Sequence, residues 1–248
     1  MNLDRIEIIL RNYNCSFLNL ELTDTTMENA KNYVKNNGFD IVVLAEEQTK
    51  GRGRRGNKWI SPKGNVYSSI ALRNNIDINN YFFFNILTTV SLQLTMEEFG
   101  IKDIKFKWPN DIFYKDKKLG GIILESYNYK NDINFVIIGL GINVFTSPDK
   151  LNYPVTNLRE ISNINDRLVF FETFMNNFFP NWINKDKNIQ DLSAKFSNSL
   201  MFLDEEILIN KGNDEIISGI FKGINKDGSL ILYKNQKLQS IYSGNIVI

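Results

Sequence analysis

The sequence contains no histidine and a single cysteine, Cys15, in 248 residues. Without an imidazole, the chain has no Ser-His-Asp or Cys-His relay and no HExxH zinc site. One cysteine allows neither an intramolecular disulfide nor a cysteine-cluster zinc site, and this usage fits a reducing compartment. If the chain is an enzyme, it works through Lys, Arg, carboxylates, backbone amides or a metal held by oxygen ligands.

Long apolar runs and a large excess of one charge are also absent. No apolar stretch approaches the roughly 18 residues of a membrane span, and residues 1–5 do not open a signal peptide. The 29 Lys and Arg against 28 Asp and Glu leave a net charge of +1, which argues against a strongly basic nucleic-acid coat. The length and the 43% hydrophobic share fit a soluble protein with either one large domain or a large domain and a small companion. We expect a cytoplasmic protein that does not associate with membranes.

Hydrophobic periodicity predicts helices and strands along the larger part of the chain. A capping box is predicted in which the Thr25 hydroxyl and the Glu28 carboxylate bond to free backbone amides, at the start of a helix that Gly38 ends. A second helical pattern stops before Gly100, and a third stops before Pro180. Strands are predicted at residues 41–45, 66–72, 104–108, 112–114, 119–126 and 135–144.

The last fifty residues change to short runs of alternating apolar and polar side chains. These runs occupy residues 206–210, 216–224, 229–233 and 238–248. Residues 227–228 and 234–235 are typical of the turns between such strands. We therefore predict a domain boundary near Leu200, with a large domain at residues 1–199 and a small, separate β-barrel at residues 200–248.

Residues 46–65 break the periodicity with four Gly, one Pro and several cations, so we predict a long loop with a functional role. Its centre, residues 51–59, holds three Arg and one Lys spaced by Gly. Arg side chains bind anions bidentately, and Gly lets backbone amides approach a ligand closely. A solvated basic loop and an RNA-binding Arg-Gly segment are the alternatives, but the cluster is single and the net charge nearly neutral. We favour a site for a phosphate or carboxylate.

Three further segments place polar groups or glycine at the ends or in the middle of strands. Residues 107–111 end a strand at a proline, so Asn110 and Asp111 emerge where loops carry functional groups, although an ordinary Asx turn has the same pattern. Lys118 precedes an apolar strand and can point its ammonium into a pocket, although most such lysines are exposed. Glycines within the buried strand at residues 139–141 indicate close approach by a ligand or another backbone. Neither a P-loop nor a dinucleotide-binding fingerprint is present.

The order and joint presence of these motifs resemble the biotin protein ligase family. The matching segments are residues 24–26, 47–59, 107–111, 118–125 and 139–143, and residues 223–230 are similar to the small SH3-like domain of that family. The resemblance implies an α+β fold, with a mixed-sheet catalytic domain of the biotin/lipoate ligase type and a C-terminal SH3-like β-barrel. About twenty residues precede Asp24, too few for the N-terminal helix-turn-helix of repressor-type members, so we expect a short form without operator-DNA binding.

The resemblance implies an ATP-dependent biotin–[acetyl-CoA-carboxylase] ligase. Such an enzyme converts biotin and MgATP to biotinoyl-5′-AMP and pyrophosphate, then transfers biotin to one lysine of a biotin carboxyl carrier domain on a carboxylase. The implied cofactors are ATP and Mg²⁺, with unassigned metal ligands, and the implied assembly is a monomer or a homodimer. A lipoyl-type ligase and a non-catalytic Arg-Gly RNA-binding module remain alternatives, and the joint presence of the motifs at residues 51–56 and 107–111 argues for biotin.

The resemblance also implies a role for individual residues. Catalytic roles fall to Arg52, Lys118 and Asp111, with Asp111 the candidate that receives the proton of the acceptor lysine. Biotin contacts fall to Thr25, Thr26, Met27, Gln48, Arg52, Gly53, Arg54, Lys118 and Gly121. ATP or adenylate contacts fall to Arg52, Arg54, Arg55, Trp59, Asn110, Lys118 and Asn143. Met27 stands where many family members carry Asn, so a biotin contact from this side chain is open.

Overall fold

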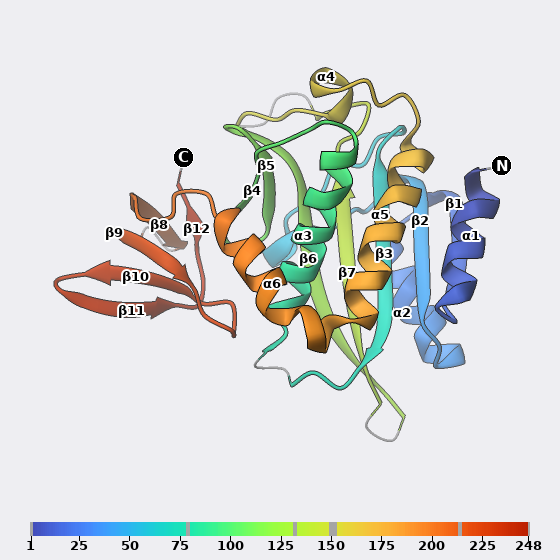
Figure 1. The fold of residues 1–248 in the computed structure, drawn as a ribbon, viewed down its shortest axis with the longest axis horizontal. Coiled ribbons are helices and arrows are strands. Elements are labelled where there is room, and N and C mark those ends of the chain that lie inside the picture. The colour runs from blue at the N-terminus through green and yellow to red at the C-terminus, as the bar shows by residue number, and fades with distance from the viewer. Residues whose placement is uncertain (1, 78–79, 131–132, 149–152, 213–214, 248) are drawn as a thin grey trace.

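The chain forms a large mixed sheet with helices on both faces and a smaller antiparallel sheet beside it (Figure 1). The computed structural model describes residues 2–77, 80–130, 133–148, 153–212 and 215–247. The α-helices are α1 (Asn2–Asn12), α2 (Thr26–Asn37), α3 (Phe83–Glu98), α4 (Leu158–Ile161), α5 (Arg167–Ile183) and α6 (Lys185–Asn198). The main sheet contains β1 (Ser16–Thr23), β2 (Ile41–Gln48), β3 (Val66–Asn74), β4 (Ile104–Lys107), β5 (Asp111–Tyr114), β6 (Lys117–Tyr129) and β7 (Ile133–Ile142). The small sheet contains β8 (Glu206–Gly212), β9 (Glu215–Ile224), β10 (Leu230–Lys234), β11 (Lys237–Ile241) and β12 (Asn245–Ile246).

The main sheet has the strand order β1-β2-β3-β7-β6-β5-β4, and the small sheet has the order β11-β10-β9-β8-β12. Strands β1 and β2 are parallel, and β3 pairs antiparallel with both β2 and β7. The small sheet is antiparallel throughout. The predicted α+β class with a mixed main sheet is therefore confirmed.

The two faces of the main sheet carry different amounts of helix. In β7, Ile138 joins the large core that packs against α1, α3 and α5, whereas the neighbouring Ile137 faces the smaller core beneath α2. Among the described residues, α2 is the only helix whose apolar side chains join that smaller core. Because α2 packs mainly over β2, β3 and β7 and less closely over β6, this helix leaves part of the face over β5 and β6 uncovered. The loop between β2 and β3 lies there instead, with Trp59 against Gly121 and Gly141.

Helix α2 begins at the predicted residue but without the predicted capping box. Thr25 is the N-cap in an extended conformation, and its side chain makes no capping hydrogen bond. The Glu28 carboxylate lies 3.7 Å from the Arg52 guanidinium instead of bonding back to Thr25. The Gln48 side chain replaces the capping box, because its Oε1 accepts from the Thr26 amide at 2.9 Å. The predicted stop is confirmed: Gly38, at φ 68°, ends the helix by donating to the Val34 carbonyl.

Helix α5 was predicted to stop before Pro180, but it continues through this residue and ends at Ile183. Proline inside a helix costs about 3 kcal/mol through its missing amide and a clash with the preceding turn. The side chains of Phe178, Phe179 and Trp182 are all buried in the large core on either side of Pro180. Their burial, worth on the order of 2 kcal/mol each, outweighs the local cost and keeps the helix continuous.

Other predictions near the termini were incomplete. The predicted last strand, residues 238–248, is divided into β11 and β12 around Gly244, whose φ is 149°. Helices α1, α4 and α6 and strand β1 were not predicted. The residues before Asp24 form α1 and β1, and β1 is an edge strand of the main sheet. In the described part of the chain, no helix has the length and apolar character needed to cross a membrane.

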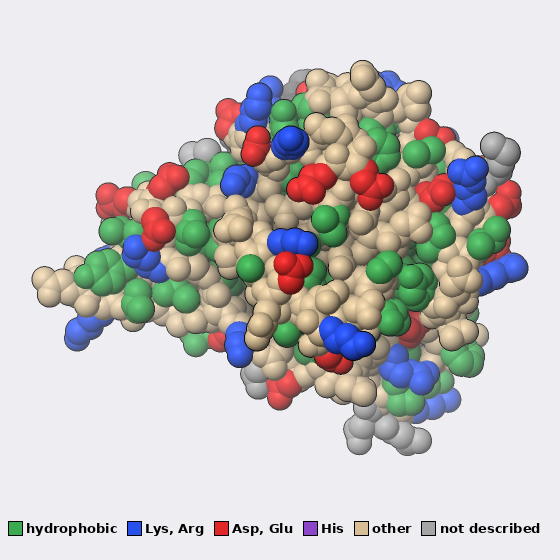
Figure 2. Space-filling model, in the orientation of Figure 1, with side chains coloured by type: hydrophobic (Ala, Val, Ile, Leu, Met, Phe, Trp, Pro, Cys, Tyr) green, Lys and Arg blue, Asp and Glu red, His purple; other side chains and the backbone are tan. Residues whose placement is uncertain are grey.

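The small sheet is joined to the main sheet through the edge strand β4. Phe106 donates its amide to the Ser199 carbonyl at 2.8 Å and accepts from the Met201 amide at 2.9 Å. Phe221 of the small sheet belongs to the same hydrophobic cluster as Phe106. Away from this junction, Figure 2 shows hydrophobic side chains over the small sheet, and those exposed by about half or more include Leu208, Ile216 and Leu238.

Candidate functional site

A cavity of about 540 Å³ opens on the face of the main sheet that α2 covers only in part. Its wall combines residues from the start of α2, the loop after β2, the β4–β5 turn and strands β6 and β7. All the predicted site residues line it except Arg55 and Asn143. The lining residues from that prediction are Thr25, Thr26, Met27, Gln48, Arg52, Gly53, Arg54, Trp59, Asn110, Asp111, Lys118 and Gly121.

The floor of the cavity is formed by bare backbone of β7. A Cβ atom at Gly141 would lie 2.7 Å from Trp59 Nε1, and one at Gly139 would lie 2.9 Å from Met27 Sδ. Either contact is shorter than real Cβ atoms make, so both side chains lie on β7 only because these positions are glycine. Gly121 of β6 is less crowded, with its nearest neighbour at 3.5 Å, again on Trp59.

At one end of the cavity, Gln48 connects the start of α2 to the loop after β2. Its Oε1 accepts from the Thr26 amide at 2.9 Å and from Thr26 Oγ1 at 3.3 Å. Its Nε2 donates to Ser61 Oγ at 3.0 Å, and Thr26 Oγ1 lies 2.8 Å from Ser69 Oγ. Because these groups are buried or half-buried, they form a preorganised polar surface for a small ligand.

At the other end of the cavity, Lys118 Nζ lies 2.8 Å from Asp111 Oδ1. The same ammonium lies 5.3 Å from the ring centroids of both Trp59 and Tyr153. These cation–π contacts and the ion pair hold a lysine that is mostly removed from solvent. Lys118 therefore points into the cavity as predicted, although it lies within β6 instead of in the turn before it.

Asn110 fixes the β4–β5 turn to β6. Its side-chain Nδ2 donates to the Ile122 carbonyl, and its carbonyl accepts from the Ile122 amide, both at 2.9 Å. This reciprocal pair makes residue 110 a support for the neighbouring Asp111 as well as a lining residue.

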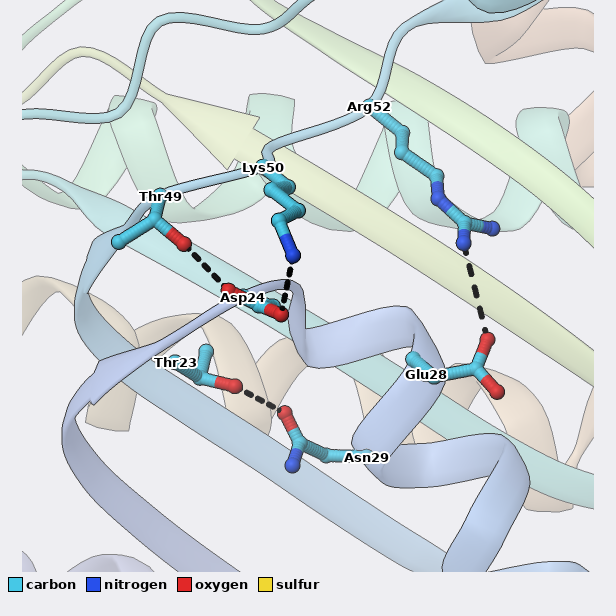
Figure 3. A network of polar contacts seen from close by, with 7 residues as sticks. All are labelled: Thr23, Asp24, Glu28, Asn29, Thr49, Lys50 and Arg52. Atoms are coloured by element: carbon cyan, nitrogen blue, oxygen red, sulfur yellow. Dashed lines mark hydrogen bonds and ion pairs between the residues drawn. The ribbon is translucent and has the colours of Figure 1, made fainter.

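The basic loop is tied to the start of α2 by exposed polar contacts (Figure 3). Asp24 accepts from Thr49 Oγ1 and lies 2.9 Å from Lys50 Nζ. These hydrogen bonds, that from Thr49 first, hold the pKa of the Asp24 carboxyl below its usual range. Arg52 lies 3.7 Å from Glu28 and 4.0 Å from Glu125. Exposed pairs of this kind contribute about 1 kcal/mol or less, so the loop can exchange them for contacts with a ligand.

Arg55 and Asn143 do not line the cavity. Arg55 lies in an exposed turn at φ 55°, whereas Arg54 beside it lines the wall. Burial, and then the neighbouring Arg55 charge, lowers the pKa of Arg54 from its usual value. Asn143 lies at the end of β7 and is 2% exposed; its Nδ2 donates to the Thr156 carbonyl, while its buried Oδ1 has no hydrogen-bond partner.

Several lining residues were not predicted. They include Ser68, Lys107, Trp108, Tyr153, Asn245 and Ile246. Lys107 is buried, and this burial lowers the pKa of its ammonium. The alternation of Ile104 and Phe106 into the core could have placed Lys107 on the other face. No local signal connects Asn245 to the cavity, because its approach depends on how the small sheet packs.

Among the described residues there is no group of three or more Asp, Glu, His or Cys side chains arranged to hold a metal ion. Asp111 is the only carboxylate among the described residues that line the cavity.

Comparison with known proteins places these features in a family. A family model described as "Biotin/lipoate A/B protein ligase family" matches residues 20–143, and one described as "Biotin protein ligase C terminal domain" matches residues 202–248. The chain is 29% identical to the bifunctional ligase/repressor BirA of Bacillus subtilis (strain 168), over 91% of this chain and 72% of that relative. It is 28% identical to the biotin–[acetyl-CoA-carboxylase] ligase of Paracoccus denitrificans, over 86% of this chain and 92% of that relative. The structure of the biotin protein ligase from Aquifex aeolicus in complex with biotin and ATP is similar with a TM-score of 0.75 and 26% identity, over 94% of this chain and 97% of that one.

Proposed function

Because the chain belongs to the biotin/lipoate A/B protein ligase family, we propose that it activates biotin with ATP and transfers the biotinoyl group to a protein lysine. The match of the C-terminal residues to the biotin protein ligase C-terminal domain supports biotin over lipoate as the acid. The Aquifex aeolicus relative, which was solved with biotin and ATP, supports the same pair of small substrates.

The charge of the cavity is the observation that carries the proposal. Among the described residues, five cationic side chains line it against a single carboxylate, in a chain whose net charge is only +1. The cations are Arg52, Arg54, Lys58, Lys107 and Lys118. Such a concentration of positive charge on one cavity fits a ligand set of a carboxylate and a triphosphate.

In the first step, a carboxylate oxygen of biotin attacks the α-phosphorus of ATP. A new bond joins that oxygen to the α-phosphorus, and the bond between the α-phosphorus and the bridging oxygen to the β-phosphate breaks, which releases pyrophosphate. Lys118, Arg54 and Lys107 lower the barrier by holding the two anions together and by stabilising charge on the phosphate oxygens.

In the second step, the amine of the acceptor lysine attacks the carbonyl carbon of the mixed anhydride. The carbon–nitrogen bond forms and AMP leaves with the anhydride oxygen. We propose that Asp111 receives the amine proton, since it is the only described carboxylate in the cavity wall. Lys118, 2.8 Å away, orients this carboxylate before the transfer.

We propose that Mg²⁺ binds together with ATP. Mg²⁺ in nucleotide sites commonly takes one or two protein carboxylates and completes its shell with phosphate oxygens and water. Asp111 fits such a donor set, which needs no cluster of acids. When bound, Mg²⁺ would supply neutralisation of phosphate charge.

The remaining expectations follow from this reaction. We propose residues 1–199 as the catalytic domain and residues 200–248 as the SH3-like domain, and a biotin carboxyl carrier domain of a carboxylase as the acceptor. We also propose that the residues named from the family resemblance bind biotin and the adenylate, including Arg55 and Asn143. The need for ATP and the buried free thiol of Cys15 support a cytoplasmic setting.

Biotin-dependent exchange of radioactive pyrophosphate into ATP tests the first half-reaction directly. We expect exchange with biotin and Mg²⁺, little with lipoate or octanoate, and none without an acid. Exchange that lipoate supports as well as biotin would assign the enzyme to the lipoyl-type reaction. A chain that retains RNA on a filter but catalyses no exchange would be a binding module instead.

A further inference from the structure

The small sheet reaches the cavity at two places. Asn245 and Ile246 of β12 form part of its wall. In addition, the turn between β9 and β10 contacts Trp108, whose Nε1 donates to the Gly228 carbonyl at 2.9 Å. Trp108 is 2% exposed, so this hydrogen bond is shielded from water and connects groups 120 residues apart in the chain.

The turn that carries the Gly228 carbonyl is held in one conformation. Gly228 has φ 86°, and its amide donates to the Asn225 carbonyl at 2.9 Å. Asp227 Oδ1 accepts from both the amide and the hydroxyl of Ser229, at 2.9 and 2.6 Å. A Cβ atom at residue 228 would lie 2.7 Å from Cδ2 of Phe82, just before α3, so the backbone of the turn is fixed against the main domain.

On the opposite side, Trp108 leads directly into the reaction centre. Two residues later, Asn110 makes its reciprocal hydrogen bonds with Ile122. Asp111 follows and pairs with Lys118. The β4–β5 turn is therefore fixed at both ends, by Gly228 through the indole of Trp108 and by Ile122 through Asn110.

We propose that the Gly228 carbonyl is a positioning group for the reaction, which acts through Trp108 to place Asn110 and Asp111 against Lys118. The inference rests on the proposed function and goes beyond it, because it gives the small sheet a part in the chemistry. A displacement of about 1 Å at a reacting group can cost on the order of 100-fold in rate. A turn that shifts when Gly228 is displaced therefore lowers kcat while leaving the Gln48 end of the cavity intact.

Two variants and one matched control test the proposal. Gly228→Ala introduces a Cβ against Phe82 at a positive φ. Trp108→Phe keeps an aromatic ring in the core and removes the indole donor together with part of the ring volume. Gly212→Ala is the control. Gly212 lies in the same sheet at φ 98°, and no described residue beyond its chain neighbours comes within 4 Å of its added Cβ, so the variant shares the backbone strain without the contact.

Three measurements distinguish a contact that positions the reacting groups from one that only joins the two sheets. The first is kcat and KM in biotin-dependent pyrophosphate exchange. The second is the dissociation constant for biotin, by calorimetry. The third is hydrogen exchange of the Trp108 indole and of the Ile122 amide by NMR, which needs no activity.

We expect Gly228→Ala and Trp108→Phe to lower kcat by about 10- to 100-fold while the biotin dissociation constant stays within about two-fold. The Ile122 amide should exchange faster in both, and Gly212→Ala should match the wild type in every readout. If both variants keep kcat within about two-fold of the wild type, the contact only joins the sheets and the proposal is wrong. Should Gly228→Ala fail to fold, Trp108→Phe decides alone.

The two hypotheses fail in different ways. A wild-type chain that catalyses no biotin-dependent exchange contradicts the proposed function. The hydrogen exchange of Ile122 in Gly228→Ala against Gly212→Ala still shows whether the turn of the small sheet holds the β4–β5 turn in place. If the Ile122 amide exchanges at the wild-type rate in both Gly228→Ala and Trp108→Phe, the inference is wrong whatever the reaction is.

Discussion

The ammonium of Lys118 and the carboxylate of Asp111 lie 2.8 Å apart, on neighbouring strands of the main sheet. The two residues predicted to act at the reaction centre therefore form an ion pair with each other inside the cavity. Each holds the other in place, so the loss of either changes the electrostatic field on the substrate and also leaves a partly buried charge without its partner.

Lys118→Ala should keep the fold and lower biotin-dependent pyrophosphate exchange by about 10²–10³-fold, because it removes a charge aimed at the reacting phosphate. Activity and circular dichroism of the purified variant measure this together. Lys117→Ala, one residue earlier and exposed, is the matched control and should exchange like the wild type. Full activity of Lys118→Ala would remove this lysine from the mechanism.

Substitutions of the two floor glycines should separate the two ends of the cavity. Gly141→Ala forces Trp59 away from β7, and Gly139→Ala forces a shift of Met27 and Ile123. We expect each to lower the free energy of unfolding by about 1–3 kcal/mol through overpacking. Only Gly141→Ala should change the fluorescence of Trp59, and we expect it to raise KM for ATP more than KM for biotin. A larger increase in KM for biotin than in KM for ATP would indicate that biotin, and not ATP, lies against Trp59.

Ligands should protect the basic loop from trypsin. Its ties to α2 are exposed ion pairs of Arg52 and Lys50, which weaken in salt and are readily replaced by an anionic ligand. With biotin and ATP present, we expect slower cleavage at residues 52–58, measured by mass spectrometry of the fragments. Cleavage at Lys237, in the exposed β10–β11 hairpin, serves as the internal control and should not change. Equal rates at both places with and without ligand would argue against closure of the loop.

Asp227 should make stability depend on pH in the acid range. Hydrogen bonds from the Ser229 hydroxyl and then its amide hold the pKa of this carboxyl below its ordinary value. Because the folded pKa is the lower one, the contribution is fully present above the unfolded pKa of about 3.9 and is lost as the pH falls through the folded value. Asp227→Asn should therefore lower Tm at pH 7, and the difference from wild type should shrink near pH 3. A difference that is equal at both pH values would contradict this assignment.

The single thiol should report on global opening. Burial raises the pKa of Cys15 well above its ordinary value, and the side chain is 3% exposed. Since only the thiolate reacts quickly with disulfide reagents, we expect labelling with Ellman's reagent to need unfolding of the main sheet. Complete labelling in urea but almost none in native buffer is the expected result. Rapid labelling of the native chain would mean that the segment between α1 and β1 opens locally.

The parts of the fold and site that depend on local pattern were predictable. Gly38 marks the end of α2 because few other residues accept its left-handed conformation, and Lys118 reaches the cavity because a strand begins beside it. The rest depends on tertiary packing. Helix α5 continues through Pro180 because of the aromatic core around it, and Gln48 replaces the predicted capping box across 22 residues of chain. The contribution of Asn245 to the cavity follows from the packing of two sheets, which no window of sequence contains.

The incomplete cover on one face of the main sheet has a thermodynamic consequence. Where α2 no longer covers the sheet, bound substrates would occupy the volume that a second helix fills in a fully layered domain. The substrates would therefore form part of the outer layer of the fold. Occupancy and unfolding are then linked equilibria: a ligand at 100 times its dissociation constant raises the free energy of unfolding by about 2.7 kcal/mol. The melting temperature of this chain should therefore follow the supply of its small substrates, which makes resistance to heat a direct measure of their binding.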